Sequence, residues 1–250
     1  MTRTAPSAPR LLISVRSADE ALIAASGGAD IIDIKEPRAG VLGAASPQTI
    51  RAIVDAVGGR RPVSATVGDI PLAEASAAAA ATASLGVDYV KIGAFPSGGN
   101  SINLAPFAPL AADGMRLILV IFADLAPDFA LVAQAAAAGF KGVMLDTATK
   151  GQGGLRAHLS HAALAQFIAE ARRARLMVGL AGSLRAADIA PLAALRPDIL
   201  GFRGAACAGG LREEALDLAA LTALRRLIPQ ASADMAAIGS VDGKLLVQEA

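Results

Sequence analysis

Short apolar runs of β type recur along the chain about every 25 residues, and Ala-rich segments of helical propensity separate them. Strands that alternate with helices fold into parallel βαβ units, because a helix is the usual crossover between parallel strands. Eight such runs with no shift in composition predict a single (β/α)8 barrel (TIM barrel), with an open doubly wound sheet as the alternative. The runs are residues 11–15, 30–35, 62–67, 88–93, 116–122, 141–146, 176–182 and 198–204.

Helix boundaries fit this pattern. Ser17 and Glu20 form a predicted capping box after the first run, and Ser46 before Pro47 is a predicted N-cap with proline at the first helical position. A weak repeat also links the even-numbered units GGADIIDIK, LGVDYVKIG, AGFKGVMLD and RPDILGFRG. Each unit places a chain reversal, an apolar strand and a polar residue in the same order, which βα units in general also do.

The chain is organised as one domain. Its 250 residues match the usual length of a single (β/α) barrel. We expect residues 1–10 to form a flexible tail and residues 11–228 to form the barrel. Residues 229–250 lie beyond the eighth helix, where we expect an extension that packs on the barrel or a contact between copies of the chain in a homo-oligomer.

Charge and cysteine content exclude several classes of protein. The 23 basic and 22 acidic residues give a net charge of +1, which argues against nucleic acid or an anionic membrane as a partner. A single Cys excludes an internal disulfide and a thiolate zinc site, and His158 and His161 lack a carboxylate at ligand spacing. No apolar run approaches the roughly 18 residues of a membrane span. We therefore expect a cytoplasmic protein without metal or cofactor.

Lysine is rare among the basic residues. Only Lys35, Lys91, Lys141, Lys150 and Lys244 are Lys, and the other basic residues are Arg. Arg keeps its proton in proteins, whereas a Lys in a dry or cationic pocket can lose it and act as a nucleophile or base. Each Lys at the carboxyl end of a strand is therefore a candidate for chemistry.

Two such lysines end the second and fourth runs. The period of two along a strand places Asp33 and Lys35 on one face, which in a barrel points into the mouth. Lys91 has no carboxylate neighbour in sequence, so burial and a nearby Lys should lower its pKa and suit it to proton transfer or imine formation. The alternatives are a structural ion pair for Asp33 and Lys35 and a surface position for Lys91.

The sixth run ends at Asp146 and is followed by Thr147, Ala148, Thr149, Lys150 and a glycine-rich loop. Asp146 and Lys150 can meet across this loop, and the glycines give it the mobility of a lid. A solvated turn is the alternative. Ser64, Thr66 and Asp69 around the third run and Asp124 after the fifth add polar groups whose roles the sequence leaves open.

Glycine-bearing loops follow the seventh and eighth runs. Barrels often bind phosphate there, through backbone N–H groups at a helix N-terminus that glycine leaves accessible. We expect Ser183 to be the N-cap after the seventh run and Arg203 to add a charge-assisted hydrogen bond. The predicted phosphate-binding residues are Gly182, Ser183, Arg203 and Gly204.

Four stretches, GGADIIDIKEPRAGVLGA, SATVGDIP, DYVKIG and MLDTATKG, resemble in this order the (5-formylfuran-3-yl)methyl phosphate synthase family of methanofuran biosynthesis. The likeness runs from about residue 11 to the eighth run. Its most specific parts are the Lys of DIKEP and the Asp-x-x-x-Lys of DTATK. The resemblance implies a (β/α) barrel lyase that condenses two molecules of glyceraldehyde 3-phosphate and releases one phosphate and two waters.

The resemblance also implies roles for individual residues. Lys35 matches the Schiff-base Lys, Lys91 matches a proton acceptor, and Asp146 and Lys150 match residues of the same site. The stretch IFADLAP keeps the Ala-Asp of the family at Asp124 but lacks the polar residues expected after it.

Without the resemblance, the residues indicate a Schiff-base lyase or aldolase acting on a small sugar phosphate. A deoxyribose-phosphate type of aldolase is one alternative, and it would release no inorganic phosphate. A decarboxylase of the orotidine phosphate type is another, but its D-x-K-x-x-D pattern would end at Arg38 here. A non-catalytic barrel that binds a phosphorylated ligand is the third.

Overall fold

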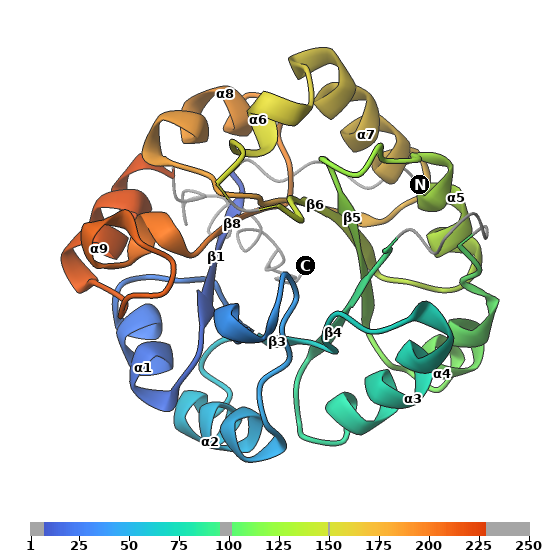
Figure 1. The fold of residues 1–250 in the computed structure, drawn as a ribbon, viewed down its shortest axis with the longest axis horizontal. Helices are drawn as coiled ribbons and strands as arrows, with labels where there is room; N and C mark the ends of the chain where they lie inside the picture. Colours follow the sequence, from blue (N-terminus) through green and yellow to red (C-terminus); the bar gives the residue numbers. More distant parts are fainter. Residues whose placement is uncertain (1–7, 96–101, 150, 229–250) are drawn as a thin grey trace, which may run out of the picture.

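The structure is a computed structural model that describes residues 8–95, 102–149 and 151–228. Eight parallel strands close into a barrel in sequence order, and helices surround it (Figure 1). The predicted (β/α)8 barrel is confirmed, and the pairing of β1 with β8 excludes the open sheet. The strands are β1 (Arg10–Val15), β2 (Ile31–Ile34), β3 (Val63–Thr66), β4 (Tyr89–Gly93), β5 (Leu117–Phe122), β6 (Gly142–Asp146), β7 (Met177–Leu180) and β8 (Ile199–Phe202).

The helices form the outer layer in Figure 1. No helix among the described residues is long and apolar enough to cross a membrane. The α-helices are α1 (Ala18–Ser26), α2 (Pro47–Val57), α3 (Leu72–Ala83), α4 (Ala108–Ala112), α5 (Ala130–Ala137), α6 (Leu155–His158), α7 (His161–Arg173), α8 (Ile189–Ala193) and α9 (Leu218–Leu227). Short 3-10 helices are η1 (Pro37–Ala39), η2 (Ala105–Phe107), η3 (Ala186–Asp188), η4 (Gly204–Ala206) and η5 (Ala208–Gly210).

The two predicted N-caps are confirmed. The hydroxyl oxygen of Ser17 accepts the N–H of Glu20 at 3.2 Å, and that of Ser46 accepts the N–H of Thr49 at 3.1 Å. In a full capping box the Glu20 carboxylate would also accept the backbone N–H of Ser17. Here it accepts the N–H of the preceding residue, Arg16, at 2.9 Å. The Glu20 carboxylate also pairs with Arg203, the residue after β8, as described below.

Alternation along each strand sorts side chains into two cores. On β2, Ile32 and Ile34 pack in the layer between strands and helices, whereas Ile31 packs inside the barrel. Inside, Met144 fills space that Gly179 and Gly201 leave open, since a Cβ at either glycine would lie within 3.1 Å of that side chain. The apolar filling therefore occupies the barrel interior beside the polar side chains described below.

The repeat among the even-numbered units has a structural cause at the amino-terminal end of the barrel. The side chain of an Asp directly before β2, β4 and β8 accepts one N–H from the first or second residue of the preceding strand, which ties neighbouring strands together. Lys141 holds the equivalent position before β6. The bonds run from Leu11 to Asp30 at 2.7 Å, from Val63 to Asp88 at 2.8 Å and from Val178 to Asp198 at 2.8 Å.

Candidate active site

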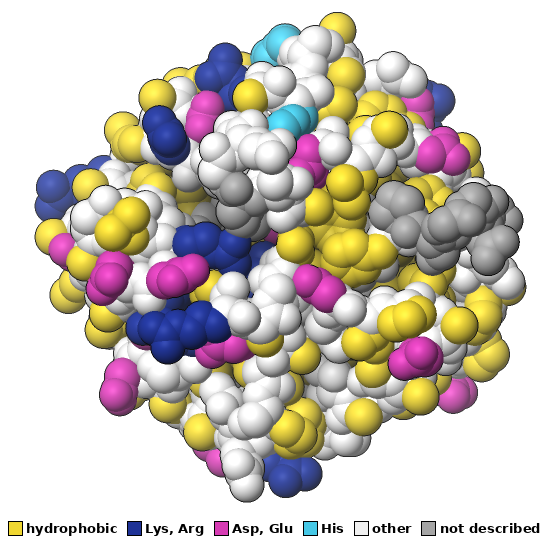
Figure 2. Space-filling model, viewed as in Figure 1, with side chains coloured by type: hydrophobic (Ala, Val, Ile, Leu, Met, Phe, Trp, Pro, Cys, Tyr) yellow, Lys and Arg dark blue, Asp and Glu magenta, His cyan; other side chains and the backbone are white. Residues whose placement is uncertain are grey.

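A cavity of about 600 Å³ opens at the carboxyl ends of the strands. We call it the mouth cavity. Residues of β1, β2, β4 and β6 line its depth, and the loops after β6, β7 and β8 line its rim. On the face drawn in Figure 2, Lys and Arg side chains gather left of centre, on the side where β8, β1 and α9 lie in Figure 1. The volume suits a small ligand, and the position is that of active sites in (β/α)8 barrels.

Lys35 follows the last residue of β2 and lines the mouth cavity. Its backbone N–H donates to the carbonyl of Val15 at 3.0 Å, which continues the parallel ladder and fixes its direction. The residue is 8% exposed, and its Nζ lies 3.5 Å from Oδ2 of Asp146 across the barrel. The structure thus brings together Lys35 and Asp146, two residues that the sequence placed on separate strands.

Asp33 pairs with Lys91. The Nζ of Lys91 donates to Oδ1 and Oδ2 of Asp33 at 2.8 and 2.9 Å. The hydroxyl of Ser64 donates to Oδ1 at 2.6 Å and that of Ser14 to Oδ2 at 2.9 Å. Both charges are almost fully buried, so the network holds an ion pair with its acceptors satisfied inside the barrel.

This arrangement corrects two expectations. Asp33 does share a face with Lys35, but its carboxylate binds Lys91 of β4 instead, so it is not a direct partner of Lys35. Lys91 lacks a carboxylate neighbour only in sequence, because barrel closure brings the carboxylate of β2 to it. Lys91 is also 4% exposed, which excludes a surface position.

The loop after β6 is fixed at its start. Oδ1 of Asp146 accepts the N–H of Thr147 at 2.7 Å. The carboxylate of Asp124, after β5, accepts the N–H groups of Ala148 at 2.7 Å and Thr149 at 2.6 Å. Burial alone would raise the pKa of Asp124, but these donors outweigh it and hold the pKa below its ordinary value. Lys150, a predicted catalytic residue, lies outside the described residues.

Asp69 fixes the loop after β2 in the same manner. Its two carboxylate oxygens accept the N–H groups of Val41 and Leu42, each at 2.6 Å. Gly40 has a φ of 132°, and a Cβ there would lie 2.2 Å from Oδ2 of Asp69, so glycine is required at this turn. Asp69 and Asp124 therefore act on the loops that follow Lys35 and Asp146.

The loop after β7 differs from the prediction. Ser183 has a left-handed φ of 48° and is not an N-cap, because the next element is the short 3-10 helix η3, which begins at Ala186. Gly182, with a φ of 103°, comes close to the β6 loop, where its carbonyl accepts the N–H of Leu155 at 2.9 Å. The N–H groups of Gly182 and Ser183 donate to no acceptor among the described residues, and both residues line the mouth cavity.

Arg203 is occupied by the protein itself. Its guanidinium donates to the Glu20 carboxylate at 2.5 and 3.1 Å and to the carbonyl of Ser14 at 3.0 Å. It also donates to the carbonyls of Arg212 and Glu214, each at 2.9 Å. These bonds use all five N–H groups of an arginine. Arg203 therefore anchors the β8 loop to α1 and β1, and it has no donor left for the phosphate contact that the sequence suggested.

Two arginines on the rim were missed by the sequence analysis. Arg212 lines the mouth cavity and donates one hydrogen bond to the carbonyl of Pro37 at 3.3 Å, which bridges the β8 and β2 loops. Arg185, in the β7 loop, lines the same cavity. Neither follows a strand directly, so position in the sequence gave no signal for them.

The other candidate ligands do not form a metal centre. Among the residues that the structure describes, no three His, Cys, Asp or Glu side chains are grouped as metal ligands would be. Cys207 is buried, and its thiol donates to the carbonyl of Arg203 at 3.2 Å. Burial raises the pKa of this thiol, although the charge of Arg203 acts in the opposite direction.

Comparison with solved structures shows the fold. A phosphoribosyl anthranilate isomerase from Thermotoga maritima is 15% identical with a TM-score of 0.64, over 88% of this chain and 98% of that one. A 3-hexulose-6-phosphate synthase is 20% identical with a TM-score of 0.58, over 88% of this chain and 100% of that one.

Comparison with protein sequences shows the family. The family model described as 4-HFC-P synthase matches residues 11–225. Proteins named (5-formylfuran-3-yl)methyl phosphate synthase from Methanopyrus kandleri and Methanosarcina acetivorans are 38% and 35% identical, over 82% and 81% of this chain and 92% of each relative. A relative from Methylorubrum extorquens, to which the same activity is provisionally assigned, is 48% identical over 84% of this chain and 87% of its own length. The chain thus belongs to the 4-HFC-P synthase family, the (5-formylfuran-3-yl)methyl phosphate synthases.

Proposed function

We propose that the chain condenses two molecules of glyceraldehyde 3-phosphate into (5-formylfuran-3-yl)methyl phosphate. The reaction releases one inorganic phosphate and two waters, which balances six carbons and both phosphorus atoms. It would class the enzyme as a carbon–oxygen lyase acting on phosphates in methanofuran-type cofactor biosynthesis. Family membership supports the product, and the placement of Lys35 in the mouth cavity is the observation that supports the chemistry. The phosphorylated substrates are charged and stay inside cells, so we place the reaction in the cytoplasm.

Lys35 is the proposed nucleophile. Its neutral amine attacks the aldehyde carbon, and the carbinolamine that forms loses water to give an iminium ion, which makes the neighbouring C–H acidic. Asp146 lies 3.5 Å from the Nζ, within reach of the protons that this addition and dehydration move. The Lys35 side chain is largely buried, which limits the contact of an imine at this position with bulk water before the second triose phosphate reacts.

The Asp33 and Lys91 pair is the proposed proton shuttle. Its groups exchange protons directly, since the Lys91 ammonium donates to both carboxylate oxygens. The pair lines the deep part of the mouth cavity next to Lys35, where the substrate carbons would lie. Asp33 thus takes part in proton transfer by exchanging protons with Lys91. Lys150 is also proposed as a member of the site, on the basis of the family motif.

Phosphate recognition is proposed for the β7 and β8 loops. The N–H groups of Gly182 and Ser183 line the cavity without acceptors among the described residues, and Gly204 lines it from β8. Arg212 supplies the cation in place of Arg203, whose donors are occupied. This arrangement fits a small sugar phosphate better than an uncharged aldehyde.

Incubation with glyceraldehyde 3-phosphate alone tests the proposal. A furan absorbance and one free phosphate per product are expected. Borohydride added during turnover should increase the mass of the peptide that contains Lys35 in the wild type and in Lys91→Ala. Lys35→Ala and Lys35→Arg should lose both labelling and turnover, because a guanidinium forms no imine. Aldol products without phosphate release would identify a Schiff-base aldolase instead, and labelling of Lys91 in Lys35→Ala would exchange the two roles.

A further inference from the structure

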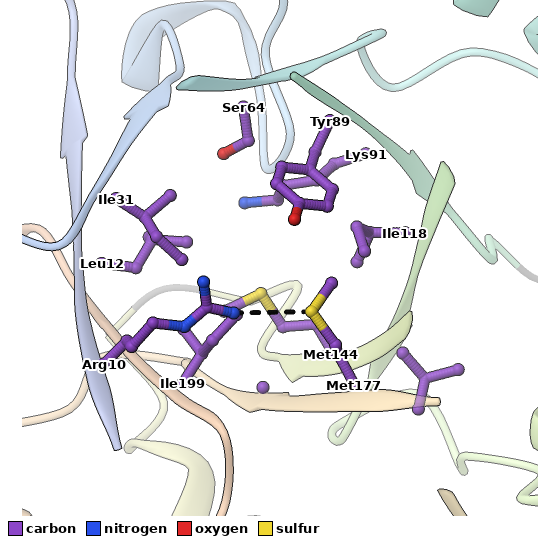
Figure 3. Close-up of a pocket in the computed structure, with 12 residues that line it drawn as sticks. Arg10, Leu12, Ile31, Ser64, Tyr89, Lys91, Ile118, Met144, Met177 and Ile199 are labelled. Atoms are coloured by element: carbon purple, nitrogen blue, oxygen red, sulfur yellow. Dashed lines mark hydrogen bonds between the residues drawn. The ribbon is translucent and has the colours of Figure 1, made fainter. Parts of the chain in front are cut away.

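A second cavity lies inside the barrel on the side of the strands' amino-terminal ends (Figure 3). We call it the lower chamber. Its volume is about 30 Å³, and its outer end is formed by first residues of strands, among them Arg10 and Tyr89, which are both partly exposed. Barrel interiors are usually filled by side chains, so a space at this depth is unusual. Its remaining wall is mainly apolar, with Ile118, Met144 and Met177 among the lining side chains.

Three side chains, those of Leu12, Lys91 and Met144, line both the lower chamber and the mouth cavity and so lie between them. Asp33 and Ser14 line only the mouth cavity, whereas Ser64 lines only the lower chamber. Ser64 therefore contacts Asp33 from the side of the lower chamber, with its hydroxyl donating to Oδ1 at 2.6 Å.

The lower chamber has the size and the polar groups that water needs. A volume of 30 Å³ accommodates about two water molecules, each of which needs two to four polar partners. The Ser64 hydroxyl donates a hydrogen bond to Asp33, and its oxygen still has lone pairs that can accept a hydrogen bond from water. In Figure 3 the Lys91 ammonium, the Ser64 hydroxyl and the Tyr89 hydroxyl all point into the chamber. The Arg116 guanidinium lies over the Tyr89 ring, 5.6 Å from its centre.

We propose that water in the lower chamber relays protons from solvent at the amino-terminal end of the barrel, through Ser64, to the Asp33 and Lys91 pair. The inference rests on the proposed function, in which this pair gives and takes protons. After Lys91 has released a proton to the substrate, its neutral amine faces the ionised Asp33 carboxylate. A solvent proton passes to the chamber water, this water protonates the Ser64 oxygen while the Ser64 hydroxyl proton moves to Oδ1 of Asp33, and the Asp33 carboxyl then passes a proton to the Lys91 amine. The net change is one proton moved from solvent to Lys91, and the reverse order removes one.

The relay answers a requirement of the reaction. In the proposed reaction the substrates occupy the mouth cavity, which Asp33 and Lys91 line, and so cover the side of the pair that faces it. Each turnover nevertheless forms two waters and moves several protons, so the pair must be reset while the mouth is occupied. Ser14 cannot serve, because its hydroxyl faces the occupied cavity and not the lower chamber.

Matched serine variants test the relay. Ser64→Ala and Ser14→Ala each remove one hydroxyl that donates a hydrogen bond to the Asp33 carboxylate. Ser14→Ala is therefore the control, because it measures the effect on kcat of losing one such hydrogen bond outside the relay. We expect Ser64→Ala to lower kcat about tenfold more than Ser14→Ala, with KM little changed and the kcat ratio between H2O and D2O increased. Ser64→Thr, which keeps the hydroxyl, should restore kcat. Equal losses and equal isotope ratios in the two alanine variants would overturn the relay in favour of a structural role.

Two further measurements keep the relay separate from the proposed function. Ile118→Phe narrows the chamber without touching Asp33, and it should reduce kcat while borohydride labelling of Lys35 persists. A high-resolution crystal structure of the wild type should show water bonded to Ser64 in the chamber, and a dry chamber would overturn the relay. Failure of the wild type to form any furan product would instead reject the proposed function, and the crystal structure would still test the water site.

Discussion

Asp33 and Lys91 are 58 residues apart in the chain, and yet the Lys91 ammonium lies 2.8 and 2.9 Å from the two oxygens of the Asp33 carboxylate. The partner that the sequence suggested for Asp33, Lys35, lies instead 3.5 Å from Asp146 on the far side of the barrel. Two lysines thus occupy different electrostatic surroundings within one cavity. The tighter, symmetric pair suits proton exchange, and Lys35 meets its carboxylate at a longer distance.

Asp33→Asn should separate proton transfer from imine formation. The substitution leaves a buried ammonium without its counter-ion, so the free energy of unfolding should fall by about 3 kcal/mol. We expect kcat to fall on the order of 100-fold, while borohydride still labels Lys35. Asp30→Asn is the matched control at the other end of β2, where it should reduce stability without changing kcat of the folded enzyme. Wild-type turnover in Asp33→Asn would remove Asp33 from the mechanism.

Arg203 and Arg212 should respond differently to replacement by Ala. Arg203→Ala leaves the Glu20 carboxylate buried without its partner, and we expect the free energy of unfolding to fall by about 3 kcal/mol in urea denaturation. Arg212→Ala should leave stability nearly unchanged and weaken the binding of inorganic phosphate about tenfold by calorimetry, through loss of one charge-assisted contact. Arg185→Ala serves as the comparison on the β7 side. Unchanged phosphate affinity in Arg212→Ala would exclude it as the phosphate-binding cation.

Asp124 should contribute stability that depends on pH. Its pKa is lowered in the folded state, so the folded protein favours the carboxylate, and the contribution is fully present above the unfolded value of 3.8. As the pH falls through the lowered pKa, the contribution is lost. We expect Asp124→Asn to be less stable than the wild type at pH 7 by on the order of 1 kcal/mol, and the difference to shrink below about pH 4. A difference that is constant with pH would show that the carboxylate charge is not what holds Ala148 and Thr149.

Cys207 should react slowly with thiol reagents. Its burial and raised pKa both reduce the fraction of accessible thiolate at pH 7. We expect iodoacetamide to modify the native protein far more slowly than the urea-unfolded chain, with the mass of the Cys207 peptide as the measurement. Cys207→Ala should keep the activity of the wild type. Rapid modification of the native protein would show that the β8 loop opens in solution.

Local pattern in the sequence was enough to predict the architecture. Alternation along β2 alone places Ile31 and Asp33 inside and Ile32 outside, because side chains on a strand have a period of two whatever lies around them. The caps at Ser17 and Ser46 were predictable for the same reason, since a cap depends on residues within one turn. The rarity of Lys also identified Lys35 and Lys91 as candidate catalytic residues, and both are buried side chains that line the mouth cavity.

The sequence by itself therefore determined the barrel and the face on which each candidate side chain lies, and only the tertiary structure decided which side chains meet. Barrel closure brought Lys91 of β4 to Asp33 of β2, and it engaged every donor of Arg203 with Glu20 and with carbonyls up to 189 residues away. No local pattern encodes these pairs, because ion pairs and hydrogen bonds depend on distances across the barrel that the strand register sets. The lower chamber has the same origin, as a space left between side chains from several strands.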